Sequence, residues 1–174
     1  ACFGAALFLA LSAPALAQQD IPTLTEVGQS AGLDHRFTGP WEFFVGGGGA
    51  SFGCNGDRRP DLLLAGGTSP ATLYVNQSSK GADLRFEERP VLATEKPLTK
   101  VTGAYPINLN NDAHADLVLL RLGSNRILLG EGNCQFRDAN KQLNFDGGRA
   151  WTTSFSAIWE PGETFPTLAF GNYV

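Results

Sequence analysis

Two short polar segments of the chain carry the same pattern of Asn and Asp side chains. Residues 53–62 and 108–117 both have Asn at the third position, Asp at the fifth and ninth positions, and Leu at the tenth. Side-chain oxygens at alternating positions of a tight loop can surround a calcium ion, which takes roughly six to eight oxygen ligands. The same side chains can instead bond to the backbone of an Asx-rich turn that holds no metal. Both interpretations remain open at the level of sequence.

The flanking residues predict the strands that position these segments. An apolar run follows each segment, a turn containing Gly comes next, and two further short runs complete the unit. The two units are offset by 55 residues, and their runs are residues 62–65, 73–75 and 86–88 in the first unit and residues 117–120, 127–129 and 136–138 in the second. Each unit therefore predicts four short strands joined by turns, with one strand before the polar segment and three after it.

A third unit begins at Trp151. Residues 155–158 and 168–171 predict strands on either side of a loop, residues 159–167, in which only Glu163 lies where an acidic ligand is expected. Four-stranded units that recur at about 50 residues predict an all-β chain, namely a β-propeller fragment of four-stranded blades that covers about three blades. Residues 24–33 are interpreted as the closing strand of a further unit, placed first so that it completes the final blade of a ring.

The first residues have the pattern of a secretory signal peptide. Residues 3–14 are apolar and uncharged, and a small-residue stretch, residues 15–17, precedes polar residues. This arrangement matches an h-region and a cleavage site. We therefore expect a signal peptide over residues 1–17, export to the periplasm or the extracellular space, and no membrane span in the mature chain. Residues 18–174 would then be the N-terminal part of a propeller that is truncated at its C-terminus.

Two cysteines, Cys54 and Cys134, remain in the expected mature chain. In an oxidising compartment they can form one disulfide, or they can stay as two buried thiols. A disulfide needs the two Cα atoms within bonding range, and the sequence does not establish that distance.

The loop pattern and its surroundings resemble a known repeat. The run from Asn55 through Asp61-Leu62, the glycines at Gly66 and Gly67, and the run from Asn110 through Asp116-Leu117 resemble the FG-GAP/VCBS repeat. That repeat is a calcium-binding β-propeller repeat, found also at the head of integrin α subunits. The whole layout is similar to bacterial relatives of cartilage acidic protein, which often carry an ASPIC/UnbV domain further along the chain.

The resemblance implies a set of calcium ligands. The first site would use Asn55, Asp57 and Asp61 with the Arg59 carbonyl, and the second would use Asn108, Asn110, Asp112 and Asp116 with the His114 carbonyl. An EF-hand is excluded because the twelfth position of each loop is Leu. The chain also departs from the repeat pattern: Gly53 and Asn108 replace a leading Asp, and Arg58 and Ala113 replace a Gly that supplies a positive φ. With two carboxylates per site, we expect calcium affinity in the weak range of about 10⁻⁴ to 10⁻³ M.

Net charge and sequence motifs exclude some classes of function. The net charge of −4 lacks the basic field that binds nucleic acid, so no nucleic-acid partner is expected. Residues 49–53 match G-x-S-x-G but lead into a turn and a strand, whereas a nucleophile elbow needs a strand-to-helix turn. No catalytic residue is assigned. We expect a binding or scaffold module of the adhesion type with a protein or glycan ligand; the alternative is the propeller part of a secreted carbohydrate-active enzyme, a polysaccharide lyase or hydrolase.

Aromatic side chains gather near the strands that precede the loops. They are Trp41, Phe43, Phe44, Phe52, Trp151, Phe155 and Trp159. Such residues can fill the core between blades, or they can form a platform on which sugar rings stack. Their spacing does not separate the two roles.

Overall fold

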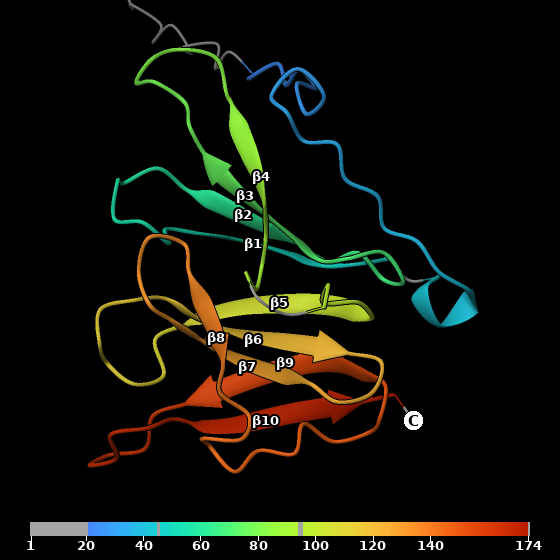
Figure 1. Cartoon of the computed structure of the whole chain (residues 1–174), viewed down its shortest axis with the longest axis vertical. Coiled ribbons are helices and arrows are strands. Elements are labelled where there is room, and N and C mark those ends of the chain that lie inside the picture. The colour runs from blue at the N-terminus through green and yellow to red at the C-terminus, as the bar shows by residue number, and fades with distance from the viewer. Residues whose placement is uncertain (1–20, 45, 94–95, 174) are drawn as a thin grey trace, which may run out of the picture.

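The computed structural model describes residues 21–44, 46–93 and 96–173, and antiparallel β-sheets make up nearly all of its regular structure (Figure 1). The expected signal peptide, residues 1–17, lies outside these residues. The first sheet has the order β1-β2-β3-β4, the second has the order β5-β6-β7-β8, and the third pairs β10 with β9. The all-β prediction with four-stranded antiparallel sheets is therefore confirmed.

Most strands overlap the runs identified in the sequence, whereas the two strands that precede the polar loops lie outside those runs. A single 3-10 turn, η1 (Trp41–Phe43), precedes the first sheet in the described part of the chain. The strands are β1 (Gly49–Phe52), β2 (Asp61–Leu64), β3 (Thr72–Asn76), β4 (Phe86–Pro90), β5 (Val101–Ile107), β6 (Asp116–Arg121), β7 (Arg126–Gly130), β8 (Phe136–Asp138), β9 (Thr152–Ile158) and β10 (Thr167–Asn172).

The segment at residues 24–33 differs from its prediction. It forms a turn closed by hydrogen bonds from the backbone N–H of Ala31 to Val27 and of Leu33 to Gly28, and no strand forms there. The turn is hydrogen-bonded to the first sheet, because the Phe86 N–H donates to the Ala31 carbonyl. Gly32, with a φ of 84°, lies at this close approach, and that conformation suits a turn better than a strand.

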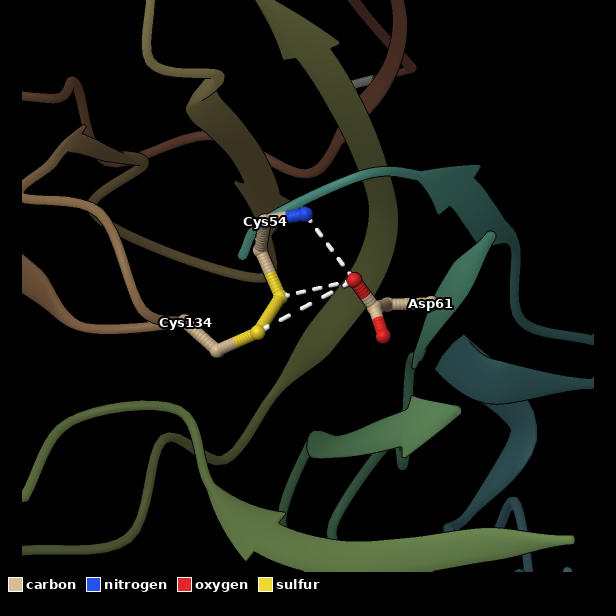
Figure 2. Close-up of side chains that lie close together, drawn as sticks. All are labelled: Cys54, Asp61 and Cys134. Atoms are coloured by element: carbon tan, nitrogen blue, oxygen red, sulfur yellow. Dashed lines mark hydrogen bonds between the residues drawn. A yellow bond between two sulfur atoms is a disulfide. The ribbon is translucent and has the colours of Figure 1, made fainter. Parts of the chain in front are cut away.

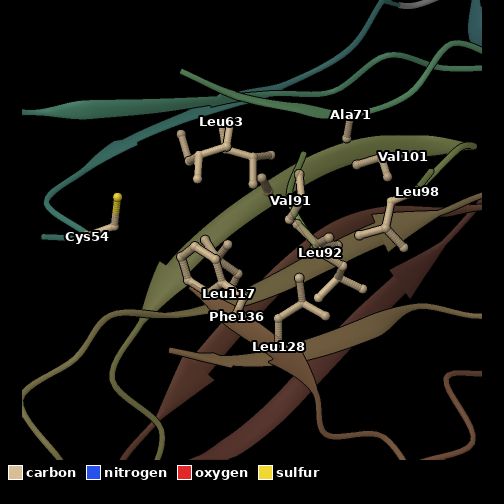
Figure 3. Close-up of a cluster of buried hydrophobic side chains, with 14 of the residues drawn as sticks. Cys54, Leu63, Ala71, Val91, Leu92, Leu98, Val101, Leu117, Leu128 and Phe136 are labelled. Carbon is tan, nitrogen blue, oxygen red and sulfur yellow. The ribbon is translucent and has the colours of Figure 1, made fainter. Parts of the chain in front are cut away.

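The three sheets pack against one another through two hydrophobic cores. The core between the first two sheets contains Leu63, Leu117 and Leu128 (Figure 3). The core between the second and third sheets contains Val118 and Leu120 with Phe155 and Phe170 packed against them. Successive residues of a strand point to opposite faces, so β6 supplies alternate side chains to the two cores. The second sheet is buried on both faces, which explains its uninterrupted apolar strands.

The first strands of successive sheets lie beside one another. β1 packs against β5, and β5 packs against β9. The Gly48 N–H donates to the Thr102 carbonyl (2.8 Å), and the Thr102 hydroxyl donates to the Thr152 carbonyl (3.2 Å). A Cβ at Gly48 would lie 3.3 Å from the Gly103 Cα atom, so a glycine here permits the close approach of the two backbones.

Among the described residues, no helix has the length and apolar character needed to cross a membrane.

Candidate functional site

The two polar loops have the same internal structure. The first joins β1 to β2 and the second joins β5 to β6. In the first loop the Asp57 N–H donates to the Asn55 side-chain oxygen (3.1 Å), and the Arg59 N–H donates to the Asp57 carboxylate (2.9 Å). In the second loop the same bonds run from Asp112 to Asn110 (3.2 Å) and from His114 to Asp112 (2.9 Å). These are Asx turns, in which side chains bond the backbone two residues away.

The aspartates at the ninth position hold each loop to its sheet. Asp61 is fully buried, and its two oxygens accept the N–H groups of Cys54 and Asn76, both at 2.9 Å. Asp116 is equally buried and accepts the N–H groups of Leu109 (2.7 Å) and Gly130 (2.8 Å). Burial raises the pKa of Asp116, although these backbone bonds oppose the shift. Each carboxylate therefore joins its loop to the third strand of the same sheet.

Both loops place non-glycine residues in the left-handed backbone region. Arg58 has a φ of 64° and Ala113 a φ of 70°, at the two positions where the repeat pattern has Gly. The positions two residues earlier, Gly56 and Asn111, also have positive φ. The two loops thus share positive φ at equivalent positions, and in both loops at least one of these positions carries a residue with a Cβ atom. Such a conformation costs roughly 1 kcal/mol or more for a residue with a Cβ atom.

A cationic side chain occupies the first loop. The Arg59 Nε donates to Asp57 Oδ2 (3.1 Å), an Nη atom lies 3.0 Å from the same oxygen, and the guanidinium also donates to the Ser78 carbonyl. Chiefly the backbone bond from Arg59, and also this side-chain contact, lower the pKa of Asp57. The sequence assigns only the carbonyl of Arg59 to the site, and the structure adds the contact of its guanidinium. The first loop does not fit a calcium ion well, because a guanidinium already binds its fifth-position carboxylate.

The second loop has no arginine at that position. His114 replaces Arg59, and the Asp112 carboxylate accepts hydrogen bonds from the Asn110 amide and the His114 N–H. The bond from the His114 N–H is the main cause that lowers the pKa of Asp112, so its carboxylate stays ionised. The Asn108 Oδ1 atom is buried and lacks a hydrogen-bond partner in the described part of the chain. The predicted ligand residues of this loop fit a calcium ion better than those of the first loop.

A disulfide joins the first loop to the second sheet. Cys54 lies in the first loop, Cys134 lies in the hairpin between β7 and β8, and their Cα atoms are 4.6 Å apart (Figure 2). The Cys134 N–H also donates to the Cys54 carbonyl (2.9 Å). Asp61 Oδ2 lies 3.0 Å from Cys54 Sγ and 3.8 Å from Cys134 Sγ. Of the two alternatives that the sequence left open, the structure has the disulfide.

A polar pocket of about 320 Å³ opens beside this disulfide. Both loops and the β7–β8 hairpin line it, with Asn55, His114 and Glu131 among its side chains. The His114 ring lies over Gly132, since a Cβ added to that glycine would be 3.1 Å from the ring. The sequence did not indicate this pocket, because residues far apart along the chain form it.

Aromatic side chains gather before the first strands of the sheets. Trp151 is buried between Trp41 (ring centroids 5.4 Å apart) and Tyr173 (5.1 Å), which are 67% and 68% exposed. Phe52 and Phe155 instead pack between sheets, against Phe136 and Tyr105. Part of the aromatic set is therefore core, and Trp41, Phe44 and Trp159 remain exposed.

No family model, no curated protein and no solved structure matches this chain significantly. The resemblance to the FG-GAP/VCBS repeat therefore remains a prediction from the sequence.

Proposed function

We propose that the chain is part of an exported β-propeller that serves as a binding or scaffold module and holds calcium at its second polar loop. The observation that carries the proposal is the arrangement of β1, β5 and β9. These are the first strands of successive sheets and lie side by side, like the innermost strands of neighbouring propeller blades. The matched hydrogen bonds in the two loops support the same interpretation, since equivalent loops are expected in equivalent blades.

Export is supported by the disulfide. Cys54 and Cys134 are bonded, and disulfides persist mainly in oxidising compartments. The signal-peptide pattern at residues 1–17 is the independent argument from sequence.

Calcium is proposed for the second loop because, within the described part of the chain, its carboxylates are not paired with an arginine as Asp57 is in the first loop. In the first loop the Arg59 guanidinium neutralises Asp57, so a divalent cation would have to displace it. In the second loop Asp112 and Asp116 offer two carboxylates to balance the charge of the ion. Asn108 Oδ1 is a buried oxygen with no hydrogen-bond partner among the residues that the structure describes. Asn110 and the His114 carbonyl complete the proposed ligand set. Two carboxylates favour an affinity of about 10⁻⁴ to 10⁻³ M.

A calcium titration of the full chain, followed by thermal unfolding, tests this proposal. At ten times Kd the bound ion should stabilise the protein by about 1.4 kcal/mol. For a chain of this size that corresponds to roughly 3–5 °C in Tm. Asp112→Asn should abolish the shift, whereas the matched variant Asp57→Asn in the first loop should retain it. The absence of any shift at 10 mM calcium, or equal losses in both variants, would contradict calcium binding at the second loop.

The ligand class is proposed to be a glycan or a protein. Trp41 and Tyr173 expose their rings beside Trp151, and exposed aromatic rings can stack on sugars. No observation in the described residues favours the alternative, a polysaccharide lyase or hydrolase. Incubation with polysaccharides separates the two functions, because a binding module retains the glycan unchanged and an enzyme releases products.

A further inference from the structure

Three potential metal ligands converge at the buried disulfide. The two sulfurs of Cys54 and Cys134 and a carboxylate oxygen of Asp61 all lie within 4.8 Å of one another, and all three residues are buried. They come from three segments: the first loop, β2 and the β7–β8 hairpin (Figure 2). The sulfurs of a disulfide carry no proton, so their contacts with Asp61 Oδ2 are not hydrogen bonds. The carboxylate therefore faces the two sulfurs without a donor from either.

We propose that reduction of this disulfide creates a site for a thiophilic divalent ion such as Zn²⁺, with Cys54 Sγ, Cys134 Sγ and the Asp61 carboxylate as ligands. The reductant is a dithiol. It transfers two electrons and two protons, the Cys54–Cys134 bond breaks, two thiols form, and the dithiol becomes a disulfide. When the ion binds, each thiol releases its proton to solvent and a sulfur–metal bond forms. This site is independent of the calcium and propeller proposals.

The carboxylate is already oriented for this role. The Asn76 N–H holds Asp61 Oδ1, and the Cys54 N–H bonds to Oδ2 on the side of the sulfurs. Hydrogen bonds of this kind fix the orientation of metal ligands. In a tetrahedral zinc site with bonds of about 2.3 Å, two sulfurs lie roughly 3.7 Å apart. Rotation of the two cysteine side chains about their Cα–Cβ bonds separates the sulfurs once the disulfide is broken.

The pocket beside the disulfide supplies access and space for a fourth ligand. Cys54 lines this pocket together with Glu131 and His114, and its volume of about 320 Å³ accommodates water as well as an ion. Two thiolates and one carboxylate make a soft, anionic ligand set. Such a set selects zinc over calcium, which prefers only oxygen ligands.

The second loop provides an internal control. Asp116 has the same burial and the same two backbone bonds as Asp61, but Leu109 stands where the first loop has Cys54. The second loop therefore has the carboxylate without the thiols. A substitution of Asp116 should disturb the packing of its loop as much as a substitution of Asp61 does in the first loop, but it removes none of the three proposed ligands.

Cobalt(II) is a suitable probe, because its thiolate complexes absorb in the near ultraviolet and its tetrahedral complexes absorb in the visible. The full chain is reduced with a dithiol, freed of reductant under anaerobic conditions and titrated with Co²⁺. We expect one equivalent to bind with both sets of bands, Zn²⁺ to displace it, and the oxidised chain to give no bands. Asp61→Asn should weaken binding at least tenfold, and Asp116→Asn, which removes none of the three ligands, should weaken it far less.

A second measurement covers the case in which Asp61→Asn does not fold. In the reduced wild-type chain, Zn²⁺ should slow alkylation of Cys54 and Cys134 by iodoacetamide at least tenfold, and Ca²⁺ should not. Cys134→Ser should remove the protection of Cys54. The proposal is overturned if reduced wild-type protein gives no thiolate–cobalt band, if Asp116→Asn weakens binding as much as Asp61→Asn, or if zinc leaves the alkylation rate unchanged.

Discussion

At the scale of single residues, the two polar loops show how one neighbour changes the chemistry of an otherwise equal turn. Asp57 and Asp112 accept the same backbone hydrogen bond, and both have a lowered pKa for that reason. Only Asp57 also contacts a guanidinium, that of Arg59. The pair is partly exposed, so it contributes little to folding stability. The Arg59 guanidinium instead changes the chemistry of the loop, because it occupies the Asp57 oxygen that a metal cation would use.

The pKa values of the two carboxylates of the second loop should be shifted in opposite directions. We expect the pKa of Asp112 to lie below 3.8, because backbone N–H groups stabilise its charge, and the pKa of Asp116 to lie above 3.8, because burial penalises its charge. Asp112 therefore contributes stability above pH 3.8 that is lost as the pH falls through its folded pKa. The contribution of Asp116 has the opposite sign: stability rises as the pH falls through its raised pKa towards 3.8.

Carboxyl carbon NMR of the calcium-free chain between pH 2 and 8 measures both values. Asp112→Asn and Asp116→Asn assign the two signals, because each variant lacks one of them. Titration of both groups on the same side of 3.8 would show that the loop environment differs from the one described.

At the scale of elements, the loops depend on the third strand of each sheet. Gly130 ends β7, donates its N–H to Asp116, and lies under the Ala115 backbone. A Cβ atom at this position would lie 2.4 Å from the Ala115 carbonyl oxygen. The strand can approach the loop only because this residue has no side chain.

Gly130→Ala should therefore destabilise the protein by about 1–3 kcal/mol, since the new methyl group forces strand and loop apart. Urea unfolding measures the effect. The matched control is Gly53→Ala in the first loop, where an added Cβ meets nothing within 4 Å and φ is not positive, so stability should change little. Equal unfolding midpoints for the two variants would argue against the tight contact.

At the scale of the whole molecule, a covalent bond connects two sheets that also share a hydrophobic core and backbone hydrogen bonds. Cys54 and Cys134 are separated by 80 residues, and the bond joins the first loop to the hairpin of the next sheet. Closing a chain segment of that length reduces the entropy of the unfolded state by an amount equivalent to about 4.5 kcal/mol. The bond therefore holds the first two sheets together beyond what their shared core provides.

The variant Cys54→Ala/Cys134→Ala should be less stable than the oxidised wild type by about 2–4 kcal/mol, because it loses this constraint. Urea unfolding at neutral pH measures the difference. Reduced wild-type protein in a metal chelator serves as the control and should unfold near the midpoint of the double variant. An unchanged midpoint would mean that the bond does not restrict the unfolded chain.

Much of the secondary structure could be predicted from the sequence. The apolar runs and the offset of 55 residues located β2, β3, β6 and β7, because a strand's alternation and its bounding turns are local properties. The Asx turns were predicted as one of two alternatives, since Asn and Asp bond the backbone only two residues away. The turn at residues 24–33 was not predicted. Hydrogen bonds within the segment stabilise this turn, and only its sequence resembles that of a closing strand.

The sequence by itself determined most of the strands and the two loops, since those choices depend on neighbours within a few positions. The tertiary structure decided the pairing of Cys54 with Cys134, the proximity of Asp61 to their sulfurs and the pocket between the loops. These features join residues up to 80 positions apart. Their distances are set by how the sheets pack, and no local pattern encodes that packing.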